Sequence, residues 1–377
     1  MSTTTTIESL SDKVLLHILS FLPTKEVVSN CLLLSKRWER HWVQLRSLHF
    51  DETYHLDYDS FCIFVWSVIL ALKNSFQSLK VTSSVQNVRG IQVRDLNTIL
   101  HAAFRNEIQQ LDLHMTATSI LLPERFYRCK TLVTIKLYNV TLDCPTRVDF
   151  PLLKSLILTR VVFINRANMF KFFRGCPNLE HLDSTSLTIS TDCGANHLEE
   201  EPLPKLLKTK VSYSSHILFP LLCNAHFLTA RMDAATMNYV ENPMFHRLTH
   251  IDLTFASDCC NVMWNWFIQM LHNSPKLQYL TIHKESLLPN EVGEVADEYL
   301  IPECLSSQLV RFTLKYYKGL ECEVQLAKYI IQNSKVLQNM TIHTTLFDLK
   351  HPMLETFSLY PKGSVTCNLC FDIEETR

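Results

Sequence analysis

The sequence predicts an α/β protein in which a short helical unit precedes an irregular repeat solenoid built around a parallel β-sheet. Three observations support this prediction. Apolar residues near the N-terminus recur at helical spacing, an apolar motif recurs from residue 76 onward, and amphipathic segments lie between its copies. Hydrophobic residues make up 47% of the 377 residues and charged residues 19%, which is ample material for a folded core.

Three short helices are predicted in the first fifty residues. Ser11 or Asp12 can cap the first helix, which Pro23 ends; Thr24 can cap the second, and residues 35–45 predict the third. The apolar stripe of the first helix consists of Val14, Leu15, Ile18, Leu19 and Leu22. Helices this short bury little surface by themselves. We therefore expect another protein to cover part of their apolar surface.

The rest of the chain repeats the pattern apolar-x-x-apolar-x-apolar. Its copies start at Phe76, Ile108, Leu132, Leu153, Leu179, Leu206, Phe227, Leu248, Leu277, Leu309 and Leu337. The mean spacing of about 26 residues lies within the range of leucine-rich repeats. Alternating apolar residues predict a strand with one buried face. The amphipathic segments between the copies predict helices. One of these helices is expected to end at Asn273, with that residue in a left-handed C-cap. Stacked units predict a solenoid with the parallel sheet on its concave side and helices outside.

Specific motifs add a family resemblance. Residues 10–12 (LSD), 18–26 (ILSFLPTKE) and 34–38 (LSKRW), followed by Trp42, resemble an F-box of the plant type. Residues 301–342 resemble the FBD region that closes many plant F-box/leucine-rich-repeat proteins. The sequence is thus similar to the plant F-box–LRR–FBD family over nearly its whole length. One departure is Ser11, which stands where the family usually has proline and so lacks the fixed φ of that residue.

The resemblance implies four regions along the chain. These are a disordered tail, the F-box, the leucine-rich-repeat solenoid, and an FBD region that forms the terminal repeats and a cap. Their expected bounds are residues 1–7, 8–50, 51–300 and 301–377.

The resemblance also implies a function, the recognition of substrates in an SCF-type cullin–RING ubiquitin ligase. The F-box would dock onto the Skp-type adaptor, and through it onto cullin, while the solenoid binds a target protein. By position, the adaptor-facing or supporting residues are Leu10, Leu15, Ile18, Leu19, Leu22, Pro23, Leu32 and Trp38. The alternative is that these eight residues form only the internal core of the F-box and contact no partner. A second functional hypothesis is a scaffold or binding protein that assembles no active ligase.

Target binding is expected on the exposed positions of the repeat strands. Aromatic and charged side chains on a rigid sheet are suited to recognition, although an ordinary solvated face remains the alternative for each. The candidates are Lys136, Tyr138, Asp252, Tyr279, Lys315 and Tyr317.

Composition argues against several other classes. The six glycines stand apart, so no phosphate-binding glycine loop can form. A net charge of −1 offers no basic excess for nucleic acid, and the apolar run at residues 61–72 is too short to span a membrane. The 13 cysteines form no framework, and the N-terminus lacks signal-peptide features. We therefore expect the cytoplasm, the nucleus or both.

Catalytic, cofactor and metal sites are not expected. Cys367 and Cys370 form one CxxC pair without a partner pair, and alternation there favours a terminal strand with Cys367 buried over metal binding. His246 and His250 would lie about 13 Å apart on a strand. The acidic run at residues 199–201 is read as a solvated loop or, alternatively, as a docking point for a basic target. No pair of acids or nucleophile–base set is identifiable, so the protein is predicted not to be an enzyme.

Overall fold

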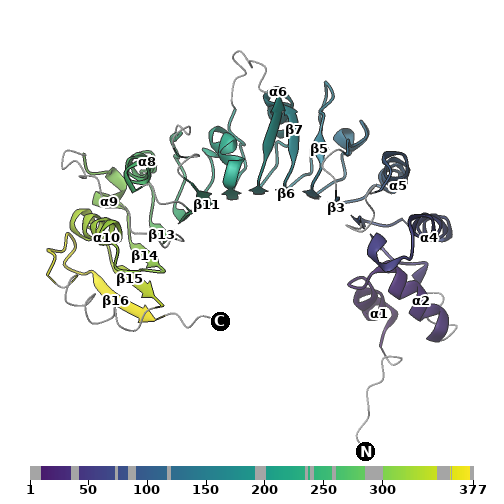
Figure 1. The fold of residues 1–377 in the computed structure, drawn as a ribbon, viewed down its shortest axis with the longest axis horizontal. Coiled ribbons are helices and arrows are strands. Elements are labelled where there is room, and N and C mark those ends of the chain that lie inside the picture. The colour runs from purple at the N-terminus through teal and green to yellow at the C-terminus, as the bar shows by residue number, and fades with distance from the viewer. Residues whose placement is uncertain are drawn as a thin grey trace, which may run out of the picture. The chain divides into compact units, whose positions relative to one another are not determined.

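The protein consists of two compact units, residues 1–179 with 187–198, and residues 180–186 with 199–377. Both are built from short parallel strands joined by helices and loops (Figure 1). The computed structural model describes residues 10–34, 42–72, 75–83, 91–116, 120–191, 201–233, 237, 242–256, 260–284, 300–345, 357 and 359–373. The predicted α/β class with a parallel sheet of many strands is confirmed.

Two helices of the N-terminal region are described, α1 (Asp12–Leu19) and α2 (Thr24–Leu34). Pro23 separates them, as predicted. Ser11 is the N-cap residue of α1, but its side chain makes no capping hydrogen bond, so that part of the expectation is wrong. Most of the third predicted helix falls on residues 35–41, outside the described part of the chain.

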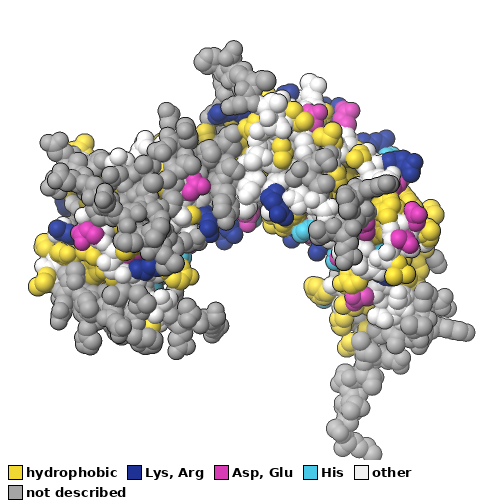
Figure 2. All heavy atoms as spheres, in the orientation of Figure 1, with side chains coloured by type: hydrophobic (Ala, Val, Ile, Leu, Met, Phe, Trp, Pro, Cys, Tyr) yellow, Lys and Arg dark blue, Asp and Glu magenta, His cyan; other side chains and the backbone are white. Residues whose placement is uncertain are grey.

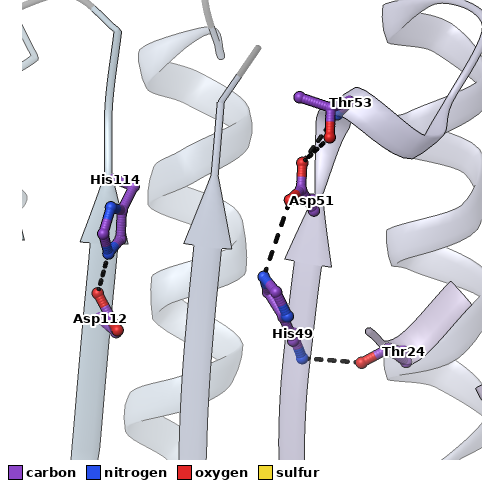
Figure 3. Close-up of polar contacts among 6 residues, drawn as sticks. All are labelled: Thr24, His49, Asp51, Thr53, Asp112 and His114. Atoms are coloured by element: carbon purple, nitrogen blue, oxygen red, sulfur yellow. Dashed lines mark hydrogen bonds and ion pairs between the residues drawn. The ribbon is translucent and has the colours of Figure 1, made fainter. Parts of the chain in front are cut away.

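Thr24 connects α2 to the first strand, β1 (Ser47–Asp51). Its hydroxyl accepts a hydrogen bond of 2.8 Å from the backbone N–H of His49 (Figure 3). The Thr24 side chain is almost completely buried. The bond therefore joins the helical N-terminal region to the sheet through a buried side chain.

Replacing Thr24 by valine keeps the shape of the side chain and removes the acceptor. Because a buried N–H is then left without a partner, we expect a loss of about 1–3 kcal/mol in the free energy of unfolding, measured by urea denaturation of the full chain. Thr53→Val is the matched control, since the Thr53 hydroxyl donates to Asp51 at 2.6 Å in an exposed position. We expect this control to change stability by less than about 0.5 kcal/mol. Equal losses in the two variants would contradict the structural role of the buried bond.

The sheet of the first unit runs in the order β1-β2-β3-β4-β6. The later strands are β2 (Ser78–Thr82), β3 (Gln110–His114), β4 (Thr134–Tyr138) and β6 (Ser155–Thr159). Alternate side chains are buried on each, and these buried positions lie in register from strand to strand. Helices cover this buried face (Figure 1), namely α4 (Tyr58–Ala71), α5 (Val93–Arg105) and α6 (Arg166–Arg174), with the short turns η2 (Glu52–Tyr54) and η3 (Phe126–Arg128).

A small second sheet in this unit has the order β5-β7-β9. Its strands are β5 (Thr141–Leu142), β7 (Val162–Asn165) and β9 (Thr188–Thr191). Inside the unit, phenylalanines from successive repeats form a continuous cluster. Phe172 of α6 lies 5.7 Å, between ring centroids, from each of Phe150, Phe163 and Phe173, and all four are buried.

The second unit continues the same scheme in the order β8-β10-β11-β12-β13-β14-β15-β16. The strands are β8 (His181–Thr185), β10 (Lys208–Ser212), β11 (Phe227–Met232), β12 (His250–Phe255), β13 (Tyr279–Lys284), β14 (Arg311–Lys315), β15 (Asn339–Thr344) and β16 (Asn368–Ile373). Their backing elements are η4 (Tyr213–Leu222), α8 (Cys260–His272), α9 (Glu303–Ser307) and α10 (Glu321–Asn333). Figure 1 shows α8, α9 and α10 on one side of the strands, and no described helix lies on the other side, which we call the open face.

The predicted repeats match the strands closely. In every copy except one, the strand begins two residues after the first apolar residue of the motif. The exception is β11, which begins at Phe227 itself. The buried residues there are Ala225, Leu228 and Ala230, whereas Phe227 is 42% exposed, so the expected phase was wrong by two residues. Strand β1 was not predicted, although it follows the same motif. It spans residue 50, where the boundary between the F-box and the repeat region was expected. That boundary stays a prediction.

Two further predictions concern the C-terminal strand and the end of helix α8. Strand β16 pairs with β15, and Cys367 just before it is buried, as the alternation predicted. Asn273 does not adopt the left-handed conformation expected of it. Its side-chain amide instead donates to the carbonyl of Asn242 at 2.5 Å, which satisfies a backbone group of the preceding repeat. In the described part of the chain, no helix is both long enough and apolar enough to cross a membrane.

Candidate binding surfaces

Helix α1 and the turn after it expose a stripe of large apolar side chains. Val14, Ile18 and Leu22 are four residues apart, and Phe21 lies three residues beyond Ile18; all are exposed, Phe21 by 73%. Phe21 is braced by His17, whose ring lies edge-on at 4.9 Å. Hydrophobic side chains are visible on the surface around α1 (Figure 2). We call these four residues the F-box stripe; its apolar area is available to a partner.

The eight residues expected at the adaptor interface divide into groups. Ile18 and Leu22 belong to the stripe. Leu15 and Leu19 are buried within the unit and so can only support it, while Leu10 and Pro23 are partly exposed. The side chains of Leu32 and Trp38 lie outside the described residues. The role of all eight in adaptor binding stays a prediction.

Two residues of the F-box stripe were missing from the expected set, Val14 and Phe21. Val14 stood in the predicted helical stripe, and Phe21 lies three residues beyond Ile18, so the helical spacing already contained the signal. The family motif does not indicate them, because a motif position does not show whether its side chain is exposed.

The open sheet face of the first unit is polar. His49, Lys80, Asp112 and Lys136 lie in register on four neighbouring strands. Asp112 pairs with His114 at 2.8 Å (Figure 3), and the His114 ring stacks on Tyr138 at 3.8 Å. Burial lowers the pKa of His49, and the nearby charge of Lys80 lowers it further. The candidates Lys136 and Tyr138 are therefore both on the open face, and Tyr138 is held by its stacked neighbour.

The open face of the second unit carries a row of rings in contact, in which His250 and Tyr279 are stacked and Phe227 is tilted by 31° against His250. Phe227, His250, Tyr279 and Arg311 are the first residues of β11 to β14 and lie in register. The ring centroid of His250 lies 4.3 Å from that of Phe227 and 4.3 Å from that of Tyr279. The guanidinium of Arg311 lies 5.9 Å from the ring centroid of Tyr279. Burial lowers the pKa of His250, which favours the neutral ring inside the stack. We call these four residues, three rings and one guanidinium, the aromatic row.

Charged residues lie farther along the same strands. Asp252 pairs with His283 at 3.0 Å, and Lys315 lies in register with His283 on the next strand. The candidates Asp252, Tyr279 and Lys315 are thus together on one face.

The exposure expected for Tyr317 is wrong. Strand β14 ends at Lys315, and Tyr316 turns the chain with a φ of 56°. Tyr317 consequently points inward, where it is 4% exposed and lies 6.0 Å from the ring of Phe357. Burial raises the pKa of Tyr317 to about 12.

An open cleft of about 530 Å³ lies between α5 and the segment around η3. Its lining includes Arg105, Glu124, Arg125 and Arg128. Arg128 pairs with Glu124 at 2.6 Å, and Arg125 contacts His101 at the same distance, so two of its three arginines are engaged within the protein.

The described residues give no sign of a metal centre. Across those ranges, no group of three His, Cys, Asp or Glu side chains is placed to hold a metal ion. Burial raises the pKa of the Cys144 and Cys304 thiols to about 12 and also raises that of Cys367, which keeps these thiols protonated. Glu199 and Glu200, in the acidic run, lie outside the described part.

Comparison with known proteins assigns the regions of the chain. The family model of the F-box domain matches residues 7–50, and that of FBD matches residues 300–342. Residues 96–200 match the model described as the LRR repeats of the FBD-associated F-box protein At5g56370. None of the three descriptions is that of a catalytic domain.

Relatives in Arabidopsis thaliana are similar over almost the whole length. The F-box/FBD/LRR-repeat protein At4g26340 is 28% identical, and the alignment covers 97% of this chain and 99% of the relative. The FBD-associated F-box protein At4g10400 is 26% identical with the same coverage. The resemblance inferred from the motifs is thereby confirmed: this chain carries in order an F-box, leucine-rich repeats and an FBD region, as the plant F-box/FBD/LRR-repeat proteins do.

Proposed function

We propose that this protein is the substrate-recognition subunit of an SCF-type cullin–RING ubiquitin ligase. The F-box stripe carries the proposal, because it offers a large apolar surface within the residues that match the F-box domain. A Skp-type adaptor would cover this stripe and connect the chain to cullin. The open face of the repeat sheet would hold the target protein.

In this role the chain positions its partners and performs no bond chemistry. Holding a target beside the ligase raises the effective concentration of its lysines near the conjugating enzyme. The chain then needs no catalytic residue, cofactor or metal of its own. Its place would be the cytoplasm, the nucleus or both, where it meets its partners in the reducing environment that 13 cysteines without a disulfide framework suit.

Ser11 bears on the alternative of a scaffold that assembles no ligase. Its backbone has φ −67° and ψ 152°, which are values that proline itself adopts. The serine therefore leaves the geometry of the F-box entry unchanged. We expect Ser11→Pro to alter adaptor affinity by less than about twofold. Ser11 by itself therefore does not favour the scaffold hypothesis.

The test is co-purification of the full chain with a Skp-type adaptor and cullin, followed by reconstituted ubiquitin transfer to proteins captured with it. We expect a stable complex of all three and transfer that requires this chain. A complex with the adaptor that excludes cullin would favour the scaffold. Absence of adaptor binding by a folded chain would overturn the proposal.

A further inference from the structure

We propose that the open face of the second unit binds an extended acidic segment of the target, whose aromatic side chains rest on the aromatic row. The inference depends on the proposed function, since it takes the ligand of the repeat sheet to be a protein. It adds the chemistry by which that protein is recognised.

The aromatic row supplies the apolar contact. Its rings are fixed against one another at centroid distances of 4.3 Å, so little side-chain entropy is lost when a ligand settles on them. Phe227 ends the row and is 42% exposed. A solvated aromatic side chain at this position is the kind of anchor that binding surfaces use.

Basic groups supply the electrostatic contact. Among the described strand residues of this face, each acid has a basic neighbour: Asp183 lies in register with Lys210, Asp372 lies in register with His343, and Asp252 pairs with His283. The described strands of this face also carry the basic side chains Lys208, Arg311 and Lys315. Among the described residues, Lys315 has no acid within ion-pair distance. Figure 2 shows Lys and Arg side chains gathered beside β11. The excess favours an acidic partner.

The spacing suits an extended chain that crosses the strands. On each strand the aromatic row and the position of Lys315 are four residues apart, roughly 13 Å at about 3.3 Å per residue. Between them lies a row of small hydroxyl side chains, Thr229, Thr281, Thr313 and Thr341, interrupted by Asp252. Small side chains there let a ligand backbone approach the sheet, with its aromatic groups on one side and its acidic groups on the other.

A single-stranded nucleic acid would also seek rings and cations. Three observations favour the peptide. The three aspartates on the same face repel a continuous phosphate backbone, the chain has a net charge of −1, and the basic excess is modest. RNA therefore becomes an outcome of the test.

The experiment measures fluorescence anisotropy of labelled decapeptides with the full chain in complex with its adaptor. The probes are alternating Glu-Tyr, Lys-Tyr and Glu-Ser decamers and a uridine decanucleotide. We expect Glu-Tyr to bind at least tenfold more tightly than the other three, and its affinity to fall with added salt. Tighter binding of the Lys-Tyr peptide or of the RNA would overturn the proposal.

Two substitutions locate the site. Lys315→Glu and Tyr279→Ala are each expected to weaken Glu-Tyr binding at least tenfold, whereas Lys276→Glu, in the exposed turn before β13, changes it by less than twofold. Circular dichroism and the urea midpoint verify that the variants fold. Unchanged binding in both folded variants would also overturn the inference. Because the complex with the adaptor is purified first, failure to bind the peptide leaves the proposed function standing, whereas loss of that complex contradicts the proposed function itself.

Discussion

Replacing Ile18 and Phe21 together by serine is expected to weaken adaptor binding by about 100-fold or more while the chain stays folded. Both side chains are exposed in the free protein, so their loss costs the F-box little of its internal packing. Burying each in an interface contributes about 1.5–3 kcal/mol, and every 1.4 kcal/mol is tenfold in affinity. Calorimetric titration of the full chain with a Skp-type adaptor measures the change.

The matched control lies on α4, where Ile63 and Leu70 are equally apolar and are 67% and 83% exposed. Replacing that pair by serine is expected to change the adaptor affinity by less than twofold. If both pairs weaken binding alike, or if the first pair has no effect, the F-box stripe is not the docking surface.

The choice of exposed residues matters for this experiment. Leu19 stands in the same F-box motif, but it is buried. Truncating it to alanine would cost about 2–5 kcal/mol of stability, so weaker binding could reflect unfolding.

Replacing Phe172 by alanine is expected to lower the free energy of unfolding by about 3–5 kcal/mol. Phe172 is fully buried and lies 5.7 Å, between ring centroids, from Phe150, from Phe163 and from Phe173 beside it on α6. Each repeat depends on its neighbours for burial, so the cavity weakens more than one repeat interface. Urea denaturation of the full chain, followed by circular dichroism, measures the loss.

Leu152→Ala serves as the comparison, because Leu152 lies close in sequence to Phe150 and is 54% exposed. Its expected cost is below about 1 kcal/mol. A Phe172→Ala variant that unfolds at the wild-type urea concentration would show that the aromatic cluster does not hold the first unit together.

Local patterns were sufficient to predict the class of fold. The first apolar residue of the motif predicted a strand start two residues later in every copy but one, because alternation on a strand with one buried face leaves a direct trace in the sequence. The failure at β11 has a physical reason. Ala225 fills the buried position, and its small side chain is a weaker signal than exposed Phe227 two residues later.

The candidate sites were predictable only in part. Five of the six target-binding candidates lie on the open sheet faces, since alternation from a known core position determines which way a strand residue points. Tyr317 failed because Tyr316, at a φ of 56°, turns the chain after the strand ends. At α1 the helical period located the apolar residues, but it could not tell Leu15 and Leu19, which are buried, from Ile18 and Phe21, which are exposed.

By itself the sequence determined the kind of protein, an F-box followed by leucine-rich repeats and an FBD region, because motifs and periodicity are local properties of the chain. Only the tertiary structure decided which apolar side chains remain available to a partner and which side chains from separate repeats meet. The row formed by Phe227, His250 and Tyr279 joins residues that are far apart in sequence. Strand register brings them together, and register depends on how whole repeats stack rather than on any local pattern.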